Sequence, residues 1–240
     1  ALYMNIVTVA RVERNPTVKH EILQKGFTRS LPVGFLVYPI SQAADITAFK
    51  ASGVPVGDDQ LPMIEQTNEI VHKINSLVSA PVLRPCKAML SDTRRLPGID
   101  GNAKMSKSLG NTLLLSASEE TIHRAVCAMY TDANHLKASD PGQIDGNMVF
   151  TYLAAFHPDK TKVAEMKAHY QRGGLGDRTC KDELEICLQE LIAPIRERRA
   201  TYIQDKGMLM DLLKKGSEQA HEVTQATLRE VKLGLGLPVF

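Results

Sequence analysis

The sequence contains no tryptophan, only four cysteines, and few aromatic residues, which make up 5% of the chain. No two cysteines form a C-x-x-C pair, the spacing typical of zinc ribbons and redox motifs. We therefore expect free thiols in a reduced, cytoplasmic protein. His123, His135, His157 and His169 show no spacing that selects a metal, so we expect no metal held by the protein itself.

An excess of one charge sign is also absent, because 29 Lys and Arg residues face 27 Asp and Glu residues, a net charge of +2. The chain as a whole has no field that would hold nucleic acid; we expect no DNA partner, and an RNA contact would need a local patch. The longest uncharged stretch, residues 30–44, is 15 residues long and contains two prolines and a glycine. It is too short and too interrupted to span a bilayer, so we expect no membrane partner.

Hydrophobic residues make up 43% of the chain and charged residues 23%, which is sufficient for one large core or two smaller ones. Up to about residue 116 the chain mixes helix and strand signals, whereas the later residues show helix patterns alone. We therefore expect an α/β domain with a parallel sheet at residues 1–116, followed by an all-α domain at residues 117–240.

Local signals divide the first domain into helices and strands. Residues 15–26 predict a helix, because they begin with an Asn-Pro cap and end in glycine. The β-rich residues 33–37 predict a strand, followed by a helix at residues 40–50. Residues 53–57 predict a buried strand, and an acidic pair then begins a helix at residues 58–76. This order suits a parallel sheet, whose ligands bind beyond the carboxyl ends of the strands.

In the second domain, Ser116 to Glu119 resembles a capping box that begins a helix ending at Met129. We expect further helices at residues 148–156, 158–171, 177–204 and 208–232, with a kink at Pro194. Between the two domains, residues 94–110 are rich in Gly, Pro, Asn, Asp and Ser and show no periodicity. A loop of this length inside a compact domain is usually functional.

This loop contains the pentapeptide Lys104-Met-Ser-Lys-Ser108, preceded by a glycine-rich segment. Two ammonium groups three positions apart, flanked by two hydroxyls, can surround a polyanion, and a loop can close them over it. The alternative is a solvated basic loop.

The pentapeptide resembles the KMSKS loop of class I aminoacyl-tRNA synthetases. The longer string PGIDGNAKMSKSLGN, at residues 97–111, is similar to the tryptophanyl branch of bacterial type. Two upstream strings agree with this branch, YPISQAAD at residues 38–45 and VPVGDDQ at residues 54–60. The three strings occur in the family's order, and the resemblance covers essentially the whole chain.

The resemblance implies a Rossmann-like catalytic domain, here partial, followed by a helical domain that binds the tRNA anticodon. It implies ATP-dependent activation of L-tryptophan to tryptophanyl-adenylate and transfer of the aminoacyl group to tRNA(Trp). The cofactors would be ATP and the Mg²⁺ that the nucleotide carries, and the family is homodimeric.

The resemblance also implies roles in ATP binding and catalysis. Lys107 would hold the β- and γ-phosphates as they separate, assisted by Lys104, Ser106 and Ser108. Met105 fits the adenine-side contact of the family. In this family the carboxylate of the amino acid attacks the α-phosphate of ATP directly, so no protein nucleophile or general base is required and catalysis would rest on positioning and on stabilising charge.

For the amino acid, Asp45 resembles the carboxylate that accepts the indole N–H. Such an acceptor rewards tryptophan and penalises phenylalanine, which would leave the carboxylate unpaired. An exposed helix charge is the alternative for this residue. Gln42 departs from the commoner bacterial pattern, which has Met immediately before Ala-Ala-Asp, so a polar amide would face the indole here.

Tyr38 and Gln60 resemble residues that bind the ammonium and carboxylate groups of the substrate. Gly57 and Asp59 resemble the contacts to the ribose of the nucleotide. Asp58, between them, fits a helix cap equally well.

No histidine in the chain begins the H-x-G-H string that the family has in its first βα unit. The resemblance therefore implies that the N-terminal part of the catalytic domain is missing from these residues, and we expect them to be inactive alone. One alternative is a tyrosyl relative, since an aspartate can also accept a phenolic O–H. The other is a non-catalytic module that binds tRNA or nucleotide.

The helical tail contains basic residues that the resemblance places near tRNA. We expect phosphate contacts from some of Arg196, Arg198, Arg199, Lys214 and Lys215. The alternative is a solvated helix face.

Overall fold

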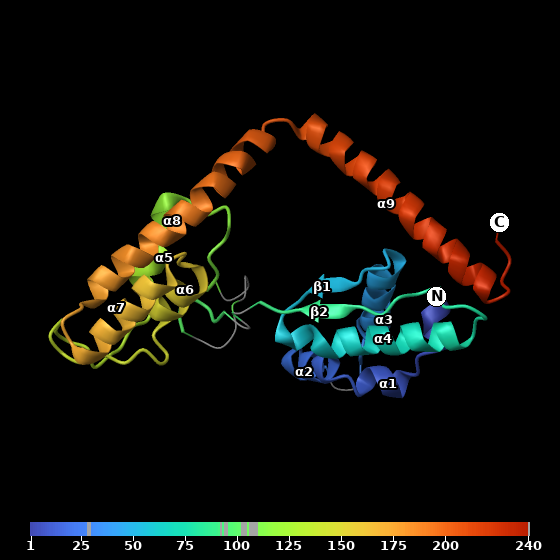
Figure 1. Cartoon of the computed structure of the whole chain (residues 1–240), viewed down its shortest axis with the longest axis horizontal. Coiled ribbons are helices and arrows are strands. Elements are labelled where there is room, and N and C mark those ends of the chain that lie inside the picture. Colours follow the sequence, from blue (N-terminus) through green and yellow to red (C-terminus); the bar gives the residue numbers. More distant parts are fainter. Residues whose placement is uncertain (28–29, 92, 94–95, 102–104, 106–109, 240) are drawn as a thin grey trace. The chain divides into compact units, whose positions relative to one another are not determined.

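The computed structural model describes residues 1–27, 30–91, 93, 96–101, 105 and 110–239 of the chain. Contacts between residues divide the chain into two compact units. The first unit consists of Ala1–Arg94 together with Asp211–Phe240, and the second of Arg95–Met210. Figure 1 traces the chain through both units, from blue at the N-terminus to red at the C-terminus.

The first unit combines helices with a small parallel sheet. Its elements are η1 (Leu2–Asn5), α1 (Val9–Glu13), α2 (Pro16–Gln24), α3 (Val33–Ala48), β1 (Gly53–Pro55), η2 (Asp58–Gln60), α4 (Leu61–Ser76) and β2 (Lys87–Met89). The strands pair in parallel, with Gly53 opposite Lys87 and Pro55 opposite Met89. Parallel strands need a crossover, which α4 supplies. The predicted parallel sheet is therefore confirmed.

Two asparagines of α4 fix the chain segment that returns to the sheet. The side-chain amide of Asn68 donates to the carbonyl oxygen of Cys86 and accepts from its N–H, both at 2.9 Å. In the last turn of α4, the Asn75 side-chain oxygen accepts the N–H groups of Val82 and Leu83 at 3.0 and 3.1 Å. These bonds satisfy backbone groups that have no strand partner at this point.

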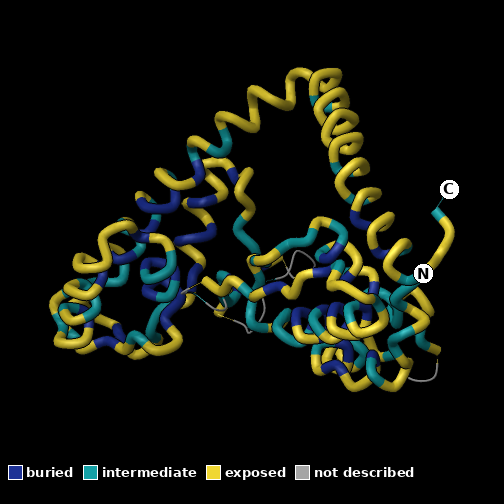
Figure 2. Tube along the Cα trace, turned by 45° about the vertical axis from the view of Figure 1, so that its right-hand side comes forward, coloured by how far each residue is buried: buried dark blue, intermediate teal, exposed yellow. Residues whose placement is uncertain are grey.

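Helices α3 and α4 pack on each other and form the core of the first unit. The last helix, α9 (Lys206–Gly234), adds one side chain to this core. Among the described residues, one buried cluster consists of Ala43, Ile70, Val71, Ile74, Leu83 and Val231, and another of Val12, Val18, Ile40 and Met63. Figure 2 shows buried residues in dark blue inside each unit, while α9 is exposed over most of its length.

The strand predicted at residues 33–37 is wrong, because these residues form the first turns of α3. The helix continues through Pro39, which is buried. A short apolar, β-rich run cannot be assigned to strand or helix by periodicity alone, and packing against α4 decides the outcome. The cap at Asn15 is confirmed, because its side chain accepts the N–H of Thr17, and Gly26 has the left-handed φ of +65° expected after a helix.

The second unit is formed by α5 (Glu119–Ala128), α6 (Met148–Phe156), α7 (Lys160–Arg172) and α8 (Asp177–Tyr202). The bounds predicted for α6 are confirmed, and α8 passes Pro194 without interruption. The predicted cap of α5 is wrong: Ser118, rather than Ser116, accepts the N–H of Thr121 at 3.2 Å. Ser116 lies two residues too early, because Ala117 and Ser118 also precede the helix.

The compact units do not divide at residue 116. Leu96, Ile99 and Leu113 pack against the core of the second unit, so the segment before α5 belongs there. The helix α9 begins in the second unit and ends in the first, where Val231 is buried. Local sequence patterns do not contain these contacts between distant residues.

A buried polar cluster fixes the connection between α5 and α6. The Nδ1 atom of His135 lies 3.1 Å from Oδ2 of Asp177, and the Tyr170 hydroxyl donates to Oδ1 of the same carboxylate at 2.7 Å. The rings of His135 and Tyr170 lie 4.4 Å apart. Burial, followed by the Asp177 carboxylate, raises the pKa of Tyr170. His135 therefore serves as a packed core residue, in agreement with the absence of metal-ligand spacing in the sequence.

Glu183 of α8 connects α8 to the start of α7. Its Oε1 atom lies 2.9 Å from Nε2 of His157 and 2.5 Å from Nζ of Lys162. The hydrogen bond from Lys162, opposed by partial burial, lowers the pKa of Glu183, and His157 contributes in the same direction.

Glu183→Gln is expected to lower the free energy of unfolding by about 1 kcal/mol at pH 7, a value discounted for solvent screening at Lys162. Because folding lowers the pKa of Glu183, its stabilisation is present above the usual value of about 4.3 and is lost as the pH falls below it. Urea unfolding of both proteins at pH 7 and pH 3 measures this. Asp182→Asn, which removes only an exposed pair with Arg178, is the control. An equal difference at both pH values would contradict the assignment.

Candidate active site

One face of α3 presents the residues that the sequence assigns to the amino acid. Tyr38, Gln42 and Asp45 are spaced by four and three residues, so they lie on the same side of the helix. Tyr38 and Gln42 are partly buried, whereas Asp45 is exposed. The structure therefore places all three on one helix, although the sequence analysis expected a strand immediately before Tyr38.

A chain of side-chain amides connects α3 with the end of β1. The amide nitrogen of Gln42 donates to Oε1 of Gln60 at 3.2 Å, and the amide nitrogen of Gln60 donates to Oδ2 of Asp59 at 3.1 Å. Gly57 adjoins this chain, because a Cβ there would lie 2.8 Å from Oδ1 of Asp59. The cluster follows the carboxyl end of β1, where parallel sheets bind ligands.

Tyr38 lies at the amino-terminal side of this cluster. Its ring packs edge-on against Phe35, with 5.6 Å between the centroids. Its hydroxyl oxygen is buried, and among the described residues no partner lies at the distance and angle of a hydrogen bond. Burial, and then the Glu21 carboxylate, raise the pKa of Tyr38, so the neutral hydroxyl is available as a donor or acceptor.

The residues predicted to contact the phosphates lie outside the described residues. These are Lys104, Ser106, Lys107 and Ser108. Met105 is described, and its side chain packs against the core of the second unit. Its predicted contact with adenine stays a prediction.

The flanks of this loop are anchored to the second unit. The buried Tyr152 hydroxyl of α6 donates to the carbonyl oxygen of Pro97 at 2.8 Å. On the other flank, the carbonyl oxygen of Asn111 accepts the N–H of Ile99 at 3.1 Å. The side-chain amide of Asn111 donates to Asp100, also at 3.1 Å. Burial, and then the charge of Asp100, raise the pKa of Tyr152 to about 12, so it remains a donor at neutral pH.

Sequence reasoning missed Tyr152 as a functional residue. It belongs to an apolar helix pattern and showed no polar signal. Asn111 was part of the string similar to the tryptophanyl branch, but its role as the residue that joins the two flanks appears only in the structure.

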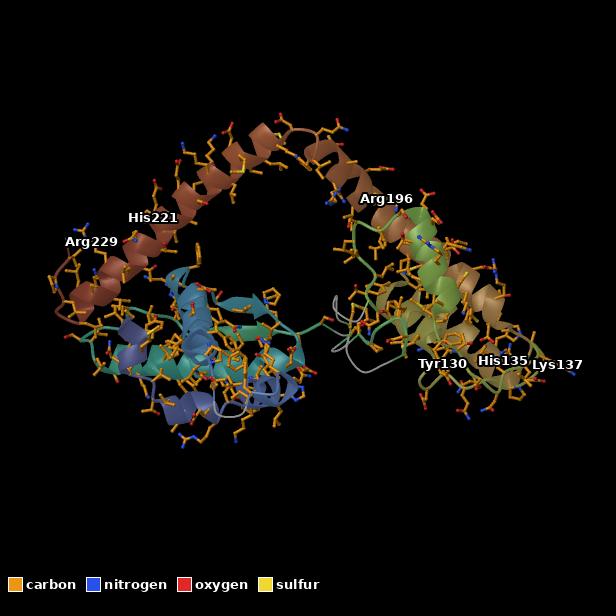
Figure 3. All side chains as sticks on the ribbon, turned by 180° about the vertical axis from the view of Figure 1, so that it is seen from behind. Tyr130, His135, Lys137, Arg196, His221 and Arg229 are labelled. Carbon is orange, nitrogen blue, oxygen red and sulfur yellow. The ribbon has the colours of Figure 1, made fainter. Side chains whose placement is uncertain are left out.

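The basic residues of the helical tail differ in their availability. Arg196 donates to the carbonyl oxygen of Ala117 at 2.9 Å and to Glu119 at 3.0 Å, so it connects α8 with the start of α5 (Figure 3). Arg198 and Arg199 are exposed, as are Lys214 and Lys215. Of the five predicted phosphate contacts, Arg196 is therefore engaged with another helix, whereas Arg198 donates to the carbonyl oxygen of Pro194 in its own helix at 3.0 Å.

Within the described ranges, no group of three His, Cys, Asp or Glu side chains could hold a metal ion. Of the helices in the same ranges, none combines the length and the apolar character needed to cross a membrane.

A sequence model for class I tRNA synthetases (W and Y) matches residues 1–193. The chain belongs to this family. It is 55% identical, over 246 residues, to the tryptophan–tRNA ligase of Streptococcus mutans, and this alignment covers 99% of the chain and 72% of that enzyme. The corresponding enzyme of Clostridium longisporum is 53% identical over 240 residues, covering 99% of the chain and 70% of the enzyme.

A solved structure agrees with the sequence relatives of this synthetase family. The tryptophanyl-tRNA synthetase of Campylobacter jejuni, in complex with ADP and tryptophan, has a TM-score of 0.75 and 26% sequence identity to the chain. The alignment covers 98% of the chain and 72% of that protein. The fold class predicted from the sequence, a Rossmann-like domain with a helical domain, is confirmed, as is the resemblance to the family.

Gly98→Ala is expected to disturb the loop flanks, because a Cβ at this position would overlap the side-chain amide of Asn111. We expect the free energy of unfolding to fall by about 1–3 kcal/mol, the usual cost of overpacking. Urea unfolding measures this.

Gly34→Ala is the control for Gly98→Ala, since no atom lies within 4 Å of the added Cβ and alanine favours the helix. Equal stability of the two variants would contradict the close packing of the flanks.

Proposed function

We propose that this protein activates L-tryptophan with ATP to form tryptophanyl-adenylate and then transfers the aminoacyl group to tRNA(Trp). The observation that supports this most directly is 53–55% identity, over 99% of the chain, to proteins named tryptophan–tRNA ligase. The chain spans about 70% of the length of these curated relatives.

The chemistry needs positioned charges rather than a protein nucleophile. The carboxylate of the amino acid attacks the α-phosphate of ATP, and pyrophosphate leaves. Lys107 and Lys104 would stabilise the charge that develops on the leaving phosphates, and Ser106 and Ser108 would donate hydrogen bonds. Mg²⁺, carried by the nucleotide, would supply further positive charge. The anchored flanks support this proposal, because Pro97 and Asn111, on either side of these lysines, are held by hydrogen bonds within the second unit.

The amide cluster of the first unit is the proposed site of the amino acid and the ribose. Asp45 would accept the indole N–H, and Gln42 would face the indole with its amide. Gln60 would contact the substrate carboxylate or ammonium group together with Tyr38. Because Gln42 and Gln60 are bonded to each other, a bound substrate can exchange this single bond for its own contacts.

Gly57 and Asp59 complete the nucleotide side of this proposed site. The absence of a side chain at Gly57 lets the Asp59 carboxylate lie close to the end of β1, within reach of a ribose hydroxyl. Met105 would contribute from the adenine side.

The domain roles, the oligomeric state and the location in the cell are also proposals. The proposed functional domains differ from the compact units: residues 1–116 would contain the remaining part of the catalytic domain and residues 117–240 the tRNA-binding domain, although Arg95–Met210 forms one compact unit. The protein would act as a homodimer in the cytoplasm.

The product of the complete reading frame is expected to exchange pyrophosphate into ATP with tryptophan and not with tyrosine. Asp45→Ala is expected to lower kcat/KM for tryptophan by about 100-fold, because the buried indole N–H would lose its partner. Asp58→Ala, which removes another carboxylate of the first unit that has no proposed contact with the substrate, is the control and should change little. Exchange with tyrosine alone would support the tyrosyl alternative. Exchange with neither, together with retained tRNA binding, would support the non-catalytic module.

Arg198→Glu combined with Arg199→Glu is expected to weaken tRNA(Trp) binding by about tenfold and to reduce its salt dependence, because two phosphate contacts are lost. Filter binding at several salt concentrations measures both effects. Arg178→Glu changes an exposed arginine at the other end of the same helix and is the control. Unchanged affinity and salt slope would exclude this patch as the contact.

A further inference from the structure

Three side chains on the surface of the second unit form a chain of thiol, imidazole and carboxylate. Cys127 and His123 lie four residues apart on α5, with Sγ of Cys127 3.6 Å from Nε2 of His123. On the other side of the ring, Nδ1 of His123 lies 2.8 Å from Oε2 of Glu185 on α8. The helices α5 and α8 pack on each other, so the arrangement is held by two well-packed elements.

The carboxylate determines how the imidazole acts. An ionised Glu185 can only accept a hydrogen bond, so the proton between the two groups belongs to Nδ1. The lone pair of Nε2 then faces the sulfur and can accept the thiol proton. This is the order of groups that activates a nucleophile through an oriented base. Cys127 is exposed, so a small molecule can reach the sulfur.

The other charged groups around the site have opposite effects on a negatively charged Cys127 sulfur. Cys127 lies in the last turn of α5, where the helix dipole disfavours a negative sulfur. Lys181 of α8 opposes this effect, because its ammonium group donates to the carbonyl oxygen of Cys127 at 2.7 Å. The hollow that contains His123 and Glu185 is also lined by Glu119, Glu120, Glu190 and Arg196. Glu119 pairs with Arg196 and Glu120 with Arg124, so Glu190 contributes a further negative charge on this side.

The other three thiols of the chain are not accessible at the surface. Cys86, Cys180 and Cys187 are buried. Burial raises the pKa of all three, in the case of Cys180 to about 12. These thiols stay protonated and inaccessible at neutral pH, so they are poor nucleophiles.

We propose that Cys127, with His123 as its base and Glu185 as the residue that orients the base, is a modification site at which hydrogen peroxide oxidises this protein. His123 takes the thiol proton, and the sulfur attacks one peroxide oxygen. The O–O bond breaks, and the departing hydroxide takes the proton from His123 and leaves as water. The sulfur loses two electrons to the peroxide and becomes a sulfenic acid. The inference does not depend on the proposed synthetase activity.

The test treats the reduced 240-residue chain with hydrogen peroxide in the presence of dimedone, which traps sulfenic acids, and locates the adduct by mass spectrometry. The adduct is expected at Cys127 and is absent in Cys127→Ser. His123→Gln should slow trapping about threefold at pH 7, because the thiol loses the base that takes its proton. At pH 9.5 ordinary thiols ionise without a base, so the two rates should converge.

Glu185 is tested as a positioning residue. Glu185→Gln should slow trapping at pH 7 only, and Glu185→Asp should restore part of the rate. Glu190→Gln removes another carboxylate of α8 that does not bond to His123, and should leave the rate unchanged. An adduct at the buried thiols, equal rates for the native chain and His123→Gln at pH 7, or equal slowing at both pH values would overturn the proposal.

Discussion

The parallel pairing of β1 with β2 is the constraint on which the first unit depends. Because two parallel strands cannot be joined by a tight turn, α4 has to cross over and lie against the sheet. Asn68 and Asn75 of α4 hold the returning segment by bonds to its backbone. Helix α3 packs on α4, and this packing sets Gln42 beside Gln60 at the carboxyl end of β1. The candidate site is therefore a consequence of strand direction.

In the second unit, single hydrogen bonds position the segments on either side of the lysine-containing loop. Tyr152 and Asn111 fix the two flanks of the lysine-containing loop, one to a helix and one to the opposite flank. The bond between Ile99 and Asn111 holds the two flanks together. A loop that has to close over a substrate needs fixed ends of this kind.

The sequence alone predicted most of the helices, because their caps are local. Asn15, Gly26 and the bounds of α6 required only the residues themselves. It failed where packing decides: residues 33–37 have β propensity but form a helix against α4, and the three-residue strand β2 gave no pattern to detect. The family was predictable because three strings preserve the order of the binding groups. The bond between Gln42 and Gln60 was not, since nothing in the spacing of two glutamines 18 residues apart indicates contact.

The assignment of α9 to both units has a consequence for synthesis. One buried cluster of the first unit contains Val231, while its other buried members come from residues 43–83. Since a chain emerges from the ribosome from its N-terminus, the second unit can complete its own core earlier, as this core ends at Ile192. The part that is translated first is thus the part that finishes folding last, and until then the surface of α3 and α4 that receives Val231 stays uncovered.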